Sequence, residues 1–140
     1  LNPEFKKISY IAGGIGITPI RSMIKFATDK KLDPDIVLFY SNHRPEDIAF
    51  REDFETMQKQ NPHLKVVSTI TCPEEIKDWP GRRGYVNEAL IKTVTPDYLE
   101  RATYLCGPPH MMDAMQITLR DKLCFPHEKI IIEKFSGYQT

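Results

Sequence analysis

The chain has 140 residues, with 19 basic and 19 acidic side chains and no formal net charge. This length is typical of one domain, and 41% hydrophobic residues can supply a core, which excludes wholesale disorder. The charge balance gives no sign of a polyanionic partner, so we do not expect nucleic-acid binding. No apolar run approaches the roughly 20 residues of a membrane span, and no signal-peptide pattern opens the chain.

The cysteines and histidines show no ligand-like spacing. Cys72, Cys106 and Cys124 are an odd number and far apart, which argues against a disulfide framework, a structural zinc or an iron–sulfur cluster. The four histidines are also scattered, so no metal site is expected. A reducing, cytoplasmic setting is the default for such a chain. Residues 1–7 fit no element, and we expect a linker or a cloning remnant there.

Strand-like and helix-like patterns alternate along the first half of the chain. Residues 8–12 form an apolar run that ends at glycines, and apolar residues then recur at helical spacing over 20–27. Residues 36–40 are continuously apolar, as in a strand covered on both faces. The stripe over 50–57 predicts a second helix, and the β-branched segment 64–70 predicts a third strand.

The second half continues this alternation. After a loop rich in Pro and Gly, Asn87 is a plausible N-cap for a short helix, with Val86 and Ile91 placed as a hydrophobic staple. A strand, a helix and a final strand are then predicted over 102–106, 112–123 and 129–133.

This order of elements predicts an α/β fold over residues 8–140. Helices between successive strands allow parallel pairing through right-handed crossovers. We therefore predict a doubly wound, five-stranded parallel sheet with helices on both faces. Ligands bind such sheets beyond the carboxyl ends of the strands. The positions to examine are those that follow Ala12, Tyr40, Ile70, Leu105 and Glu133.

The first such turn, residues 13–19, reads Gly-Gly-Ile-Gly-Ile-Thr-Pro. Its glycines permit positive φ angles and a close approach to the main chain, Thr18 is a candidate cap, and Pro19 suits a first helical turn. A helix amino terminus placed there attracts an anion such as a pyrophosphate. The alternative is a tight turn with an ordinary cap. The usual Gly-x-Gly-x-x-Gly fingerprint is not met, because Pro19 takes its last position and no acid follows the second strand.

The turn after the fourth strand reads Cys106-Gly107-Pro108-Pro109-His110. Cys106 ends a strand at the ligand edge, Gly107 leaves the approach open, and the prolines start a helix. A lone cysteine at a strand end is often a small buried hydrophobic residue. Neighbouring strand ends can nevertheless flank one crevice. Sequence places no base beside Cys106, so it is not assigned as a nucleophile, and His110 is the one histidine worth testing.

Together with a terminal Glu133-Lys134-Phe135, these two turns resemble the pyridine-nucleotide domain of the ferredoxin–NADP reductase superfamily of flavin-dependent reductases. The resemblance covers about residues 8–138. It implies strand order 3-2-1-4-5 and an enzyme domain that presents nicotinamide for hydride transfer to a flavin. Electrons would then pass to an iron–sulfur or haem protein.

The resemblance also implies a role for each motif. Cys106 would lie beside nicotinamide C4 and position hydride transfer to flavin N5, with Glu133 close to it. Phe135 would cover the flavin ring, and Tyr138 is a second candidate for that cover. The residues that would hold the pyrophosphate and complete the nicotinamide pocket are Gly13, Gly14, Gly16, Thr18, Gly107 and Pro108.

Coenzyme choice would depend on the segments after the third strand. By the resemblance, Thr71 would help to hold the adenosine half, Tyr85 would stack on adenine, and Arg82 or Arg83 would meet a 2′-phosphate. The alternative is a solvated arginine pair on a loop, with Tyr85 as a core anchor. Cys72 stands where NADP-specific relatives often carry an arginine, so NADH is slightly favoured over NADPH.

The flavin-binding barrel that such reductases carry is absent from these 140 residues. FAD or FMN would therefore be held by another domain, and the isolated chain would bind a nucleotide but catalyse little. The expected partners are that flavin domain and an electron-acceptor protein. Asn42 and Arg44, at another strand end, are further candidates for nucleotide contact. Two other functions stay open: a non-catalytic nucleotide-sensing or interaction module on the same fold, and a flavodoxin-like domain that binds FMN itself.

Overall fold

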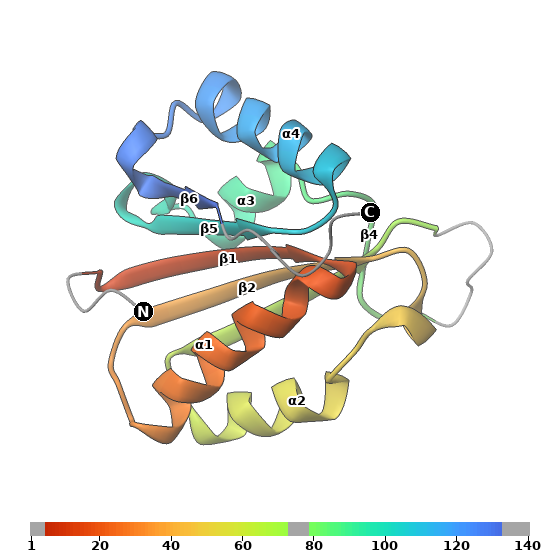
Figure 1. The fold of residues 1–140 in the computed structure, drawn as a ribbon, viewed down its shortest axis with the longest axis vertical. Helices are drawn as coiled ribbons and strands as arrows, with labels where there is room; N and C mark the ends of the chain where they lie inside the picture. The colour runs from red at the N-terminus through yellow and green to blue at the C-terminus, as the bar shows by residue number, and fades with distance from the viewer. Residues whose placement is uncertain (1–4, 73–78, 133–140) are drawn as a thin grey trace.

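The computed structural model describes residues 5–72 and 79–132, which form one parallel sheet between two layers of helices (Figure 1). The strands are β1 (Lys7–Gly13), β2 (Asp35–Asn42), β3 (Leu64–Ile70), β4 (Arg82–Arg83), β5 (Ala102–Cys106) and β6 (Ile130–Ile132). The α-helices are α1 (Ile17–Asp29), α2 (Arg51–Gln60), α3 (Glu88–Val94) and α4 (Pro109–Ile117), and a π-helical turn (Thr118–Lys122) extends α4. Short 3₁₀ turns are η1 (Gly14–Gly16), η2 (Pro45–Asp47), η4 (Tyr98–Glu100) and η6 (His127–Lys129).

The parallel α/β fold is confirmed, but the prediction of five strands is wrong. The sheet has six strands in the order β4-β3-β2-β1-β5-β6. The additional strand is β4, where Arg82 and Arg83 pair with Thr69 and Ile70 at the edge of the sheet. Two residues are too few to show a hydrophobic period, so this pairing has no local signal. Without β4, the remaining strands have the order that the family resemblance implied.

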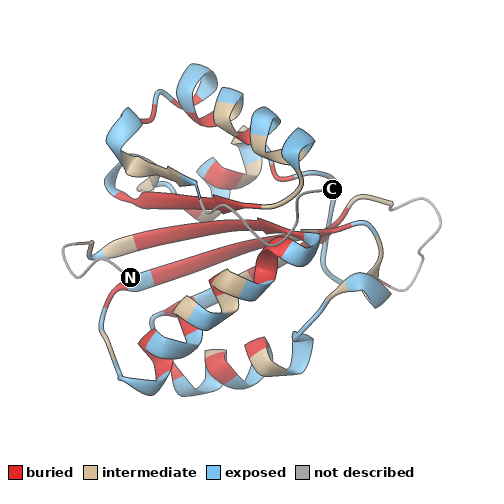
Figure 2. Ribbon diagram, in the orientation of Figure 1, coloured by how far each residue is buried: buried red, intermediate tan, exposed pale blue. Residues whose placement is uncertain are grey.

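The sheet is covered on both faces because alternate side chains of each strand enter different cores. One core, the α1–α2 cluster, contains Tyr10, Leu38 and Phe54, and the other, the α3–α4 cluster, contains Ile11 and Phe39. Figure 2 shows this burial along the central strands, with the exposed positions on the outer sides of the helices. Burying an Ile, Leu or Phe side chain contributes about 1.5–3 kcal/mol, so the continuous apolar strands stabilise this layered arrangement.

Two helix starts differ in how well the sequence predicted them. Asn87 is the N-cap of α3 as predicted, and its side-chain oxygen accepts a hydrogen bond from the Leu90 amide at 2.9 Å. Thr18 is not a cap: α1 begins at Ile17, its N-cap is Gly16, and Thr18 lies exposed in the first turn. The helix thus starts two residues earlier than a cap at Thr18 would give.

At the amino ends of the strands, Arg101 joins three of them. Its side chain is buried, and it donates hydrogen bonds to Ser9 Oγ and to the Ile8 carbonyl, each at 2.8 Å, and to the Asp35 carbonyl at 3.0 Å. A buried charge is tolerated only when hydrogen bonds satisfy it, and these acceptors belong to β1 and β2. The network therefore fixes the relative register of β1, β2 and β5 at the end of the sheet far from their carboxyl termini.

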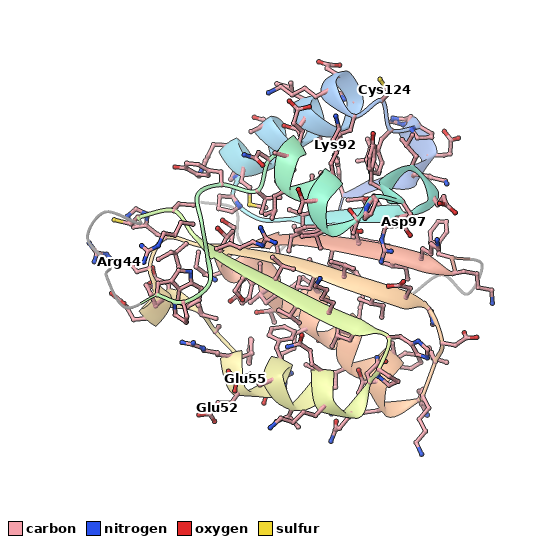
Figure 3. All side chains as sticks on the ribbon, turned by 180° about the vertical axis from the view of Figure 1, so that it is seen from behind. Arg44, Glu52, Glu55, Lys92, Asp97 and Cys124 are labelled. Carbon is pink, nitrogen blue, oxygen red and sulfur yellow. The ribbon has the colours of Figure 1, made fainter. Side chains whose placement is uncertain are left out.

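Two further charges complete this network. Lys7 Nζ lies 2.9 Å from Asp97 Oδ2, and Arg101 Nη1 lies 3.3 Å from the same oxygen. Burial raises the pKa of Asp97, but the hydrogen bond from Lys7 and the charge of Arg101 outweigh it, so the pKa lies below its usual value. Figure 3, seen from behind, shows Asp97 near the amino ends of the strands and Arg44 beyond the carboxyl ends.

Phe5 packs partly buried against the α1–α2 cluster, and the Lys6 carbonyl accepts a hydrogen bond from the Asp35 amide at 2.9 Å. The packed structure thus includes residues that the sequence had placed in a linker. Within the described parts of the chain, no helix has the length and apolar character needed to cross a bilayer.

Candidate dinucleotide-binding site

A cavity of about 760 Å³ opens at the carboxyl ends of β1, β2 and β3. This is the edge where doubly wound sheets bind ligands, and the volume is typical of a small-molecule site. Segments far apart in the chain form its walls, and the lining includes Gly13–Ile15, Ile17, Thr18, Ser41–His43, Asp47, Ala49, Phe50, Thr71, Tyr85, Val86, Pro108, His110, Met111, Ala114 and Met115.

The glycine turn allows α1 to start directly beside the end of β5. Gly14 is exposed and has a φ angle of 52°, a conformation that favours glycine. Gly16 has an ordinary helical conformation, but a Cβ atom there would collide with the carbonyl of Cys106 and lie 2.8 Å from the Gly107 nitrogen. These contacts are with backbone atoms, which cannot turn aside. Gly16 is therefore required by its neighbours and Gly14 by its own conformation.

Two helix amino termini open into the cavity. Neither α1 nor α4 has a side-chain hydrogen bond at its N-cap, and neither has an acidic residue in its first turn. The lining includes Thr18 from the first turn of α1, and His110 and Met111 from the first turn of α4. A helix amino terminus carries a partial positive charge, and this holds here even though Pro19 and Pro109 have no N–H group to donate. The cavity is thus suited to an anion such as a pyrophosphate.

Polar groups at the ends of β2 and β3 face the same space. The amide side chain of Asn42 is buried, lines the cavity, and has no hydrogen-bond partner of good geometry among the described residues. His43 Nδ1 lies 3.0 Å from Thr71 Oγ1, which joins the two strand ends. Buried amides without partners are uncommon in proteins, so the Asn42 side chain is a candidate for ligand contact.

Tyr40 fixes the segment that follows β2. Its hydroxyl accepts a hydrogen bond from the Ala49 amide at 3.0 Å and lies 3.3 Å from the Ala49 carbonyl, to which it donates. Burial raises the pKa of Tyr40, and a neutral hydroxyl is the form that makes both bonds. The bonds hold Ala49 and Phe50 at the rim of the cavity.

The structure brings part of the predicted site together. The predicted residues that line the cavity are Gly13, Gly14, Thr18, Asn42, Thr71, Tyr85 and Pro108. Gly107 lies behind this lining, against the Met111 side chain, and Gly16 lies beneath the turn. Arg82 and Arg83 are exposed on the edge strand β4. Glu133, Phe135 and Tyr138 lie outside the described residues.

Cys106 lies at the end of β5, opposite Ala12 and against the glycine turn. Its side chain is 1% exposed, belongs to the α1–α2 cluster and does not line the cavity. This is the environment of a small buried hydrophobic residue, the alternative that the sequence left open. A role beside the nicotinamide stays a prediction for this residue.

Sequence reasoning missed several lining residues. Ser41 and His43 directly follow a predicted strand, so their position in the chain was a usable signal. Asp47 and Phe50 carried no such signal, because η2 and the turn after it bring them back over the sheet edge. Phe50 was predicted to be the first residue of the apolar stripe of the second helix, but it immediately precedes α2, and its ring is 39% exposed.

Few charged groups face the cavity. Among the described lining residues, the acidic side chain is Asp47, the histidines are His43 and His110, and there is no lysine or arginine. In the described parts of the chain, no three His, Cys, Asp or Glu side chains gather in a way that could hold a metal ion. The lining is therefore better suited to hydrogen bonding and stacking than to a strongly charged group.

Fold and cavity together define a nucleotide-binding domain of the doubly wound α/β class. Residues 10–116 match the family model described as the oxidoreductase NAD-binding domain, and the chain belongs to this family. The family that the three motifs predicted is thus confirmed.

Two curated relatives illustrate the family. The glycine betaine monooxygenase reductase subunit of Chromohalobacter salexigens is 32% identical over 117 residues, which cover 81% of this chain and 31% of that protein. An NADH-cytochrome b5 reductase-like protein of Arabidopsis thaliana is 34% identical over 115 residues, which cover 80% of this chain and 34% of that protein. The chain thus spans about a third of the length of the curated relatives it matches.

Solved structures agree with this assignment. The cytochrome b5 reductase domain of Ulva prolifera nitrate reductase matches with a TM-score of 0.80 and 27% identity, over 93% of this chain and 49% of that one. The CS-b5R domains of human Ncb5or, solved in an NAD⁺ form, match with a TM-score of 0.80 and 23% identity, over 94% of this chain and 37% of that one. At that identity the second match supports the fold alone.

Proposed function

We propose that this chain is the NAD(P)H-binding domain of a flavin-dependent oxidoreductase. The observation that carries the proposal is the cavity into which the uncapped amino termini of α1 and α4 both open. Relatives named as reductase subunits and as NADH-cytochrome b5 reductases support it. The partner would be a flavin domain outside these 140 residues. The electron acceptor would be an iron–sulfur or haem protein.

The lining residues fit a dinucleotide. The main chain of Gly13, Gly14 and Thr18, with the first turn of α4, would bind the pyrophosphate, because the positive ends of two helix dipoles open into the cavity there. Thr71 and Tyr85, near the ends of β3 and β4, would hold the adenosine half. The remaining end of the cavity, beside the glycine turn and Pro108, would then receive the nicotinamide.

When bound, the coenzyme supplies a hydride from nicotinamide C4. We propose that Cys106 lies below this ring and sets its depth, since its backbone adjoins the glycine turn and its thiol lies beneath the surface. Gly107 would leave room for the ring above it. By the family resemblance, Glu133 would lie near Cys106, and Phe135 would cover the flavin.

NADH is the preferred coenzyme in this proposal. A 2′-phosphate adds about −1.5 to −2 charges and is usually bound by arginine. No lysine or arginine is among the described lining residues, and Asp47 adds a negative charge. Arg82 and Arg83 lie exposed on β4, so a role in binding a 2′-phosphate would require them to turn toward the cavity.

Calorimetric titration of this chain tests the binding half of the proposal. We expect NAD⁺ and ADP-ribose to bind, and 2′-phospho-ADP-ribose to bind at least several-fold more weakly. Absence of any ADP-ribose binding at millimolar concentration would reject the proposal. A second experiment distinguishes a reductase domain from a nucleotide-sensing module. The chain is joined to a flavin domain, and the reduction of the flavin by NADH is followed by the flavin absorbance. A sensing module would bind the nucleotide without reducing the flavin.

A further inference from the structure

Phe50 combines an unfavourable backbone conformation with an exposed ring. Its φ and ψ angles are 58° and 26°, in the left-handed region that bulky side chains rarely adopt. It precedes α2, and its carbonyl accepts a hydrogen bond from the Phe54 amide at 3.0 Å. The ring is 39% exposed and belongs to neither core cluster. Burial in a core therefore does not account for a phenylalanine at this position.

The ring is nevertheless held in place by residues that are outside the cavity lining. The guanidinium carbon of Arg21 lies 4.6 Å from the centre of the Phe50 ring, a cation–π geometry. Arg21 in turn donates two hydrogen bonds to Asp53 Oδ2, at 2.8 Å from Nε and 2.6 Å from Nη2. Phe50 lines the cavity, whereas Arg21 and Asp53 do not. The arrangement orients an aromatic surface toward the cavity before any ligand binds.

A second exposed aromatic ring lines the same cavity. Tyr85 is 73% exposed, and its neighbour Val86 belongs to the α3–α4 cluster. Phe50, by contrast, follows Ile48, which packs on the α1–α2 cluster. The segments that carry the two rings are therefore packed on opposite faces of the sheet. Aromatic side chains stack on nucleobases regardless of base identity.

We propose that the adenine of the coenzyme stacks on the Phe50 ring, on the side opposite Tyr85. Arg21 and Asp53 are positioning residues for the Phe50 ring. This rests on the proposed function, because it assigns a residue to the same site. Phe50 follows β2, and Tyr85 follows β4, so both belong to the half of the sheet that would hold adenosine. In this proposal, the unfavourable conformation and the exposed ring serve binding and not folding.

Titration with ADP-ribose, which lacks nicotinamide, tests the assignment in this 140-residue chain. We expect Phe50→Ala to weaken ADP-ribose and NAD⁺ binding alike by about tenfold, within the range of one base–aromatic stack. Phe50→Tyr should stay within about twofold of the parent because it keeps the ring. The matched control is Phe26→Ala, which removes another exposed phenylalanine, 51% exposed on α1 and outside the cavity lining.

The positioning residues and the conformation supply independent readouts. Arg21→Met should weaken ADP-ribose binding about threefold, and Arg21→Lys should restore most of it, because an ammonium group also binds an aromatic face. Phe50→Gly should leave the thermal unfolding midpoint unchanged or raise it while ADP-ribose binding falls, because glycine adopts the left-handed conformation freely. A purely structural role would lower the midpoint instead.

Several outcomes would overturn the inference. If Phe50→Ala binds ADP-ribose as tightly as the parent does, adenine does not stack on Phe50, and the proposed function stands. If NAD⁺ binding falls while ADP-ribose binding does not, the ring meets the nicotinamide half and the assignment is wrong. If the parent chain binds neither ligand, the proposed function fails as well.

Discussion

Because Gly16 lies against the end of β5, we predict that Gly16→Ala destabilises the protein. Helix propensity alone suggests the opposite. Gly16 has φ and ψ angles of −62° and −10°, which alanine adopts freely. Replacing a glycine in such a conformation by alanine usually stabilises a protein by about 0.4–1 kcal/mol, because the unfolded chain loses freedom. Judged by its own conformation, Gly16→Ala should therefore be favourable.

The neighbours of Gly16 reverse this expectation. The added Cβ would meet the Cys106 carbonyl and the Gly107 nitrogen, so the start of α1 and the end of β5 must move apart. Overpacking of this kind costs about 1–3 kcal/mol. Subtracting the conformational gain from the middle of this range leaves a net loss of about 1–1.6 kcal/mol for Gly16→Ala. Because α4 starts just after β5, this movement also separates the amino termini of α1 and α4. ADP-ribose binding should therefore weaken by about tenfold or more, which corresponds to a loss of about 1.4 kcal/mol or more in binding free energy.

Urea unfolding followed by far-ultraviolet circular dichroism measures the stability change, and calorimetry measures the binding change. Gly14→Ala is the comparison: its φ angle is 52°, but no atom lies within 4 Å of the added Cβ. It should lose about 1 kcal/mol or more through conformation alone. An unchanged or higher urea midpoint for Gly16→Ala would refute the argument, because the contact with Cys106 would then be easily relieved.

Further predictions concern the thiol, the buried networks and pH. In an enzyme that includes the flavin domain, Cys106→Ala should lower the rate of hydride transfer far more than nucleotide affinity, and equal losses in stopped-flow and titration data would contradict its role. Arg101→Met should lower the free energy of unfolding in urea by about 3–5 kcal/mol, because it leaves buried hydrogen-bond acceptors without a donor. The affinity for ADP-ribose, which would bind at the other end of the sheet, should not change. Tyr40→Phe should cost about 1–3 kcal/mol by leaving the Ala49 amide without a partner, and a smaller loss in urea unfolding would show that water replaces the hydroxyl. The pKa of Asp97 is lower in the folded state than the value of 3.8 expected in the unfolded chain. The ionised carboxylate therefore stabilises the fold fully above pH 3.8, and this stabilisation is lost as the pH falls through the folded-state pKa. In Asp97→Asn, the free energy of unfolding should fall less steeply as the pH is lowered through this range.

The order of elements and the glycine turn were predictable from sequence because their causes are local. Strands buried on both faces must be apolar throughout, as in β2, and a helix packed on a sheet must repeat its apolar residues along one face, as in α1. Asn87 was predictable as a cap for the same reason, since its partner is only three residues away. Gly14 and Gly16 were noted as glycines that permit unusual approaches, although the sequence could not tell which of them needed space and which needed a positive φ angle.

Contacts between distant residues decided the rest. Strand β4 exists because Arg82 and Arg83 meet the end of β3, and no pattern in two residues can reveal that. The need for glycine at position 16 follows from its contact with the end of β5, which lies about ninety residues away in the chain. Phe50 belongs to the cavity because the turn after η2 folds back over the sheet edge and Arg21 orients its ring. Hydrophobic periods and caps record a residue's neighbours along the chain, whereas a cavity wall is made of residues that become neighbours only when the layers pack.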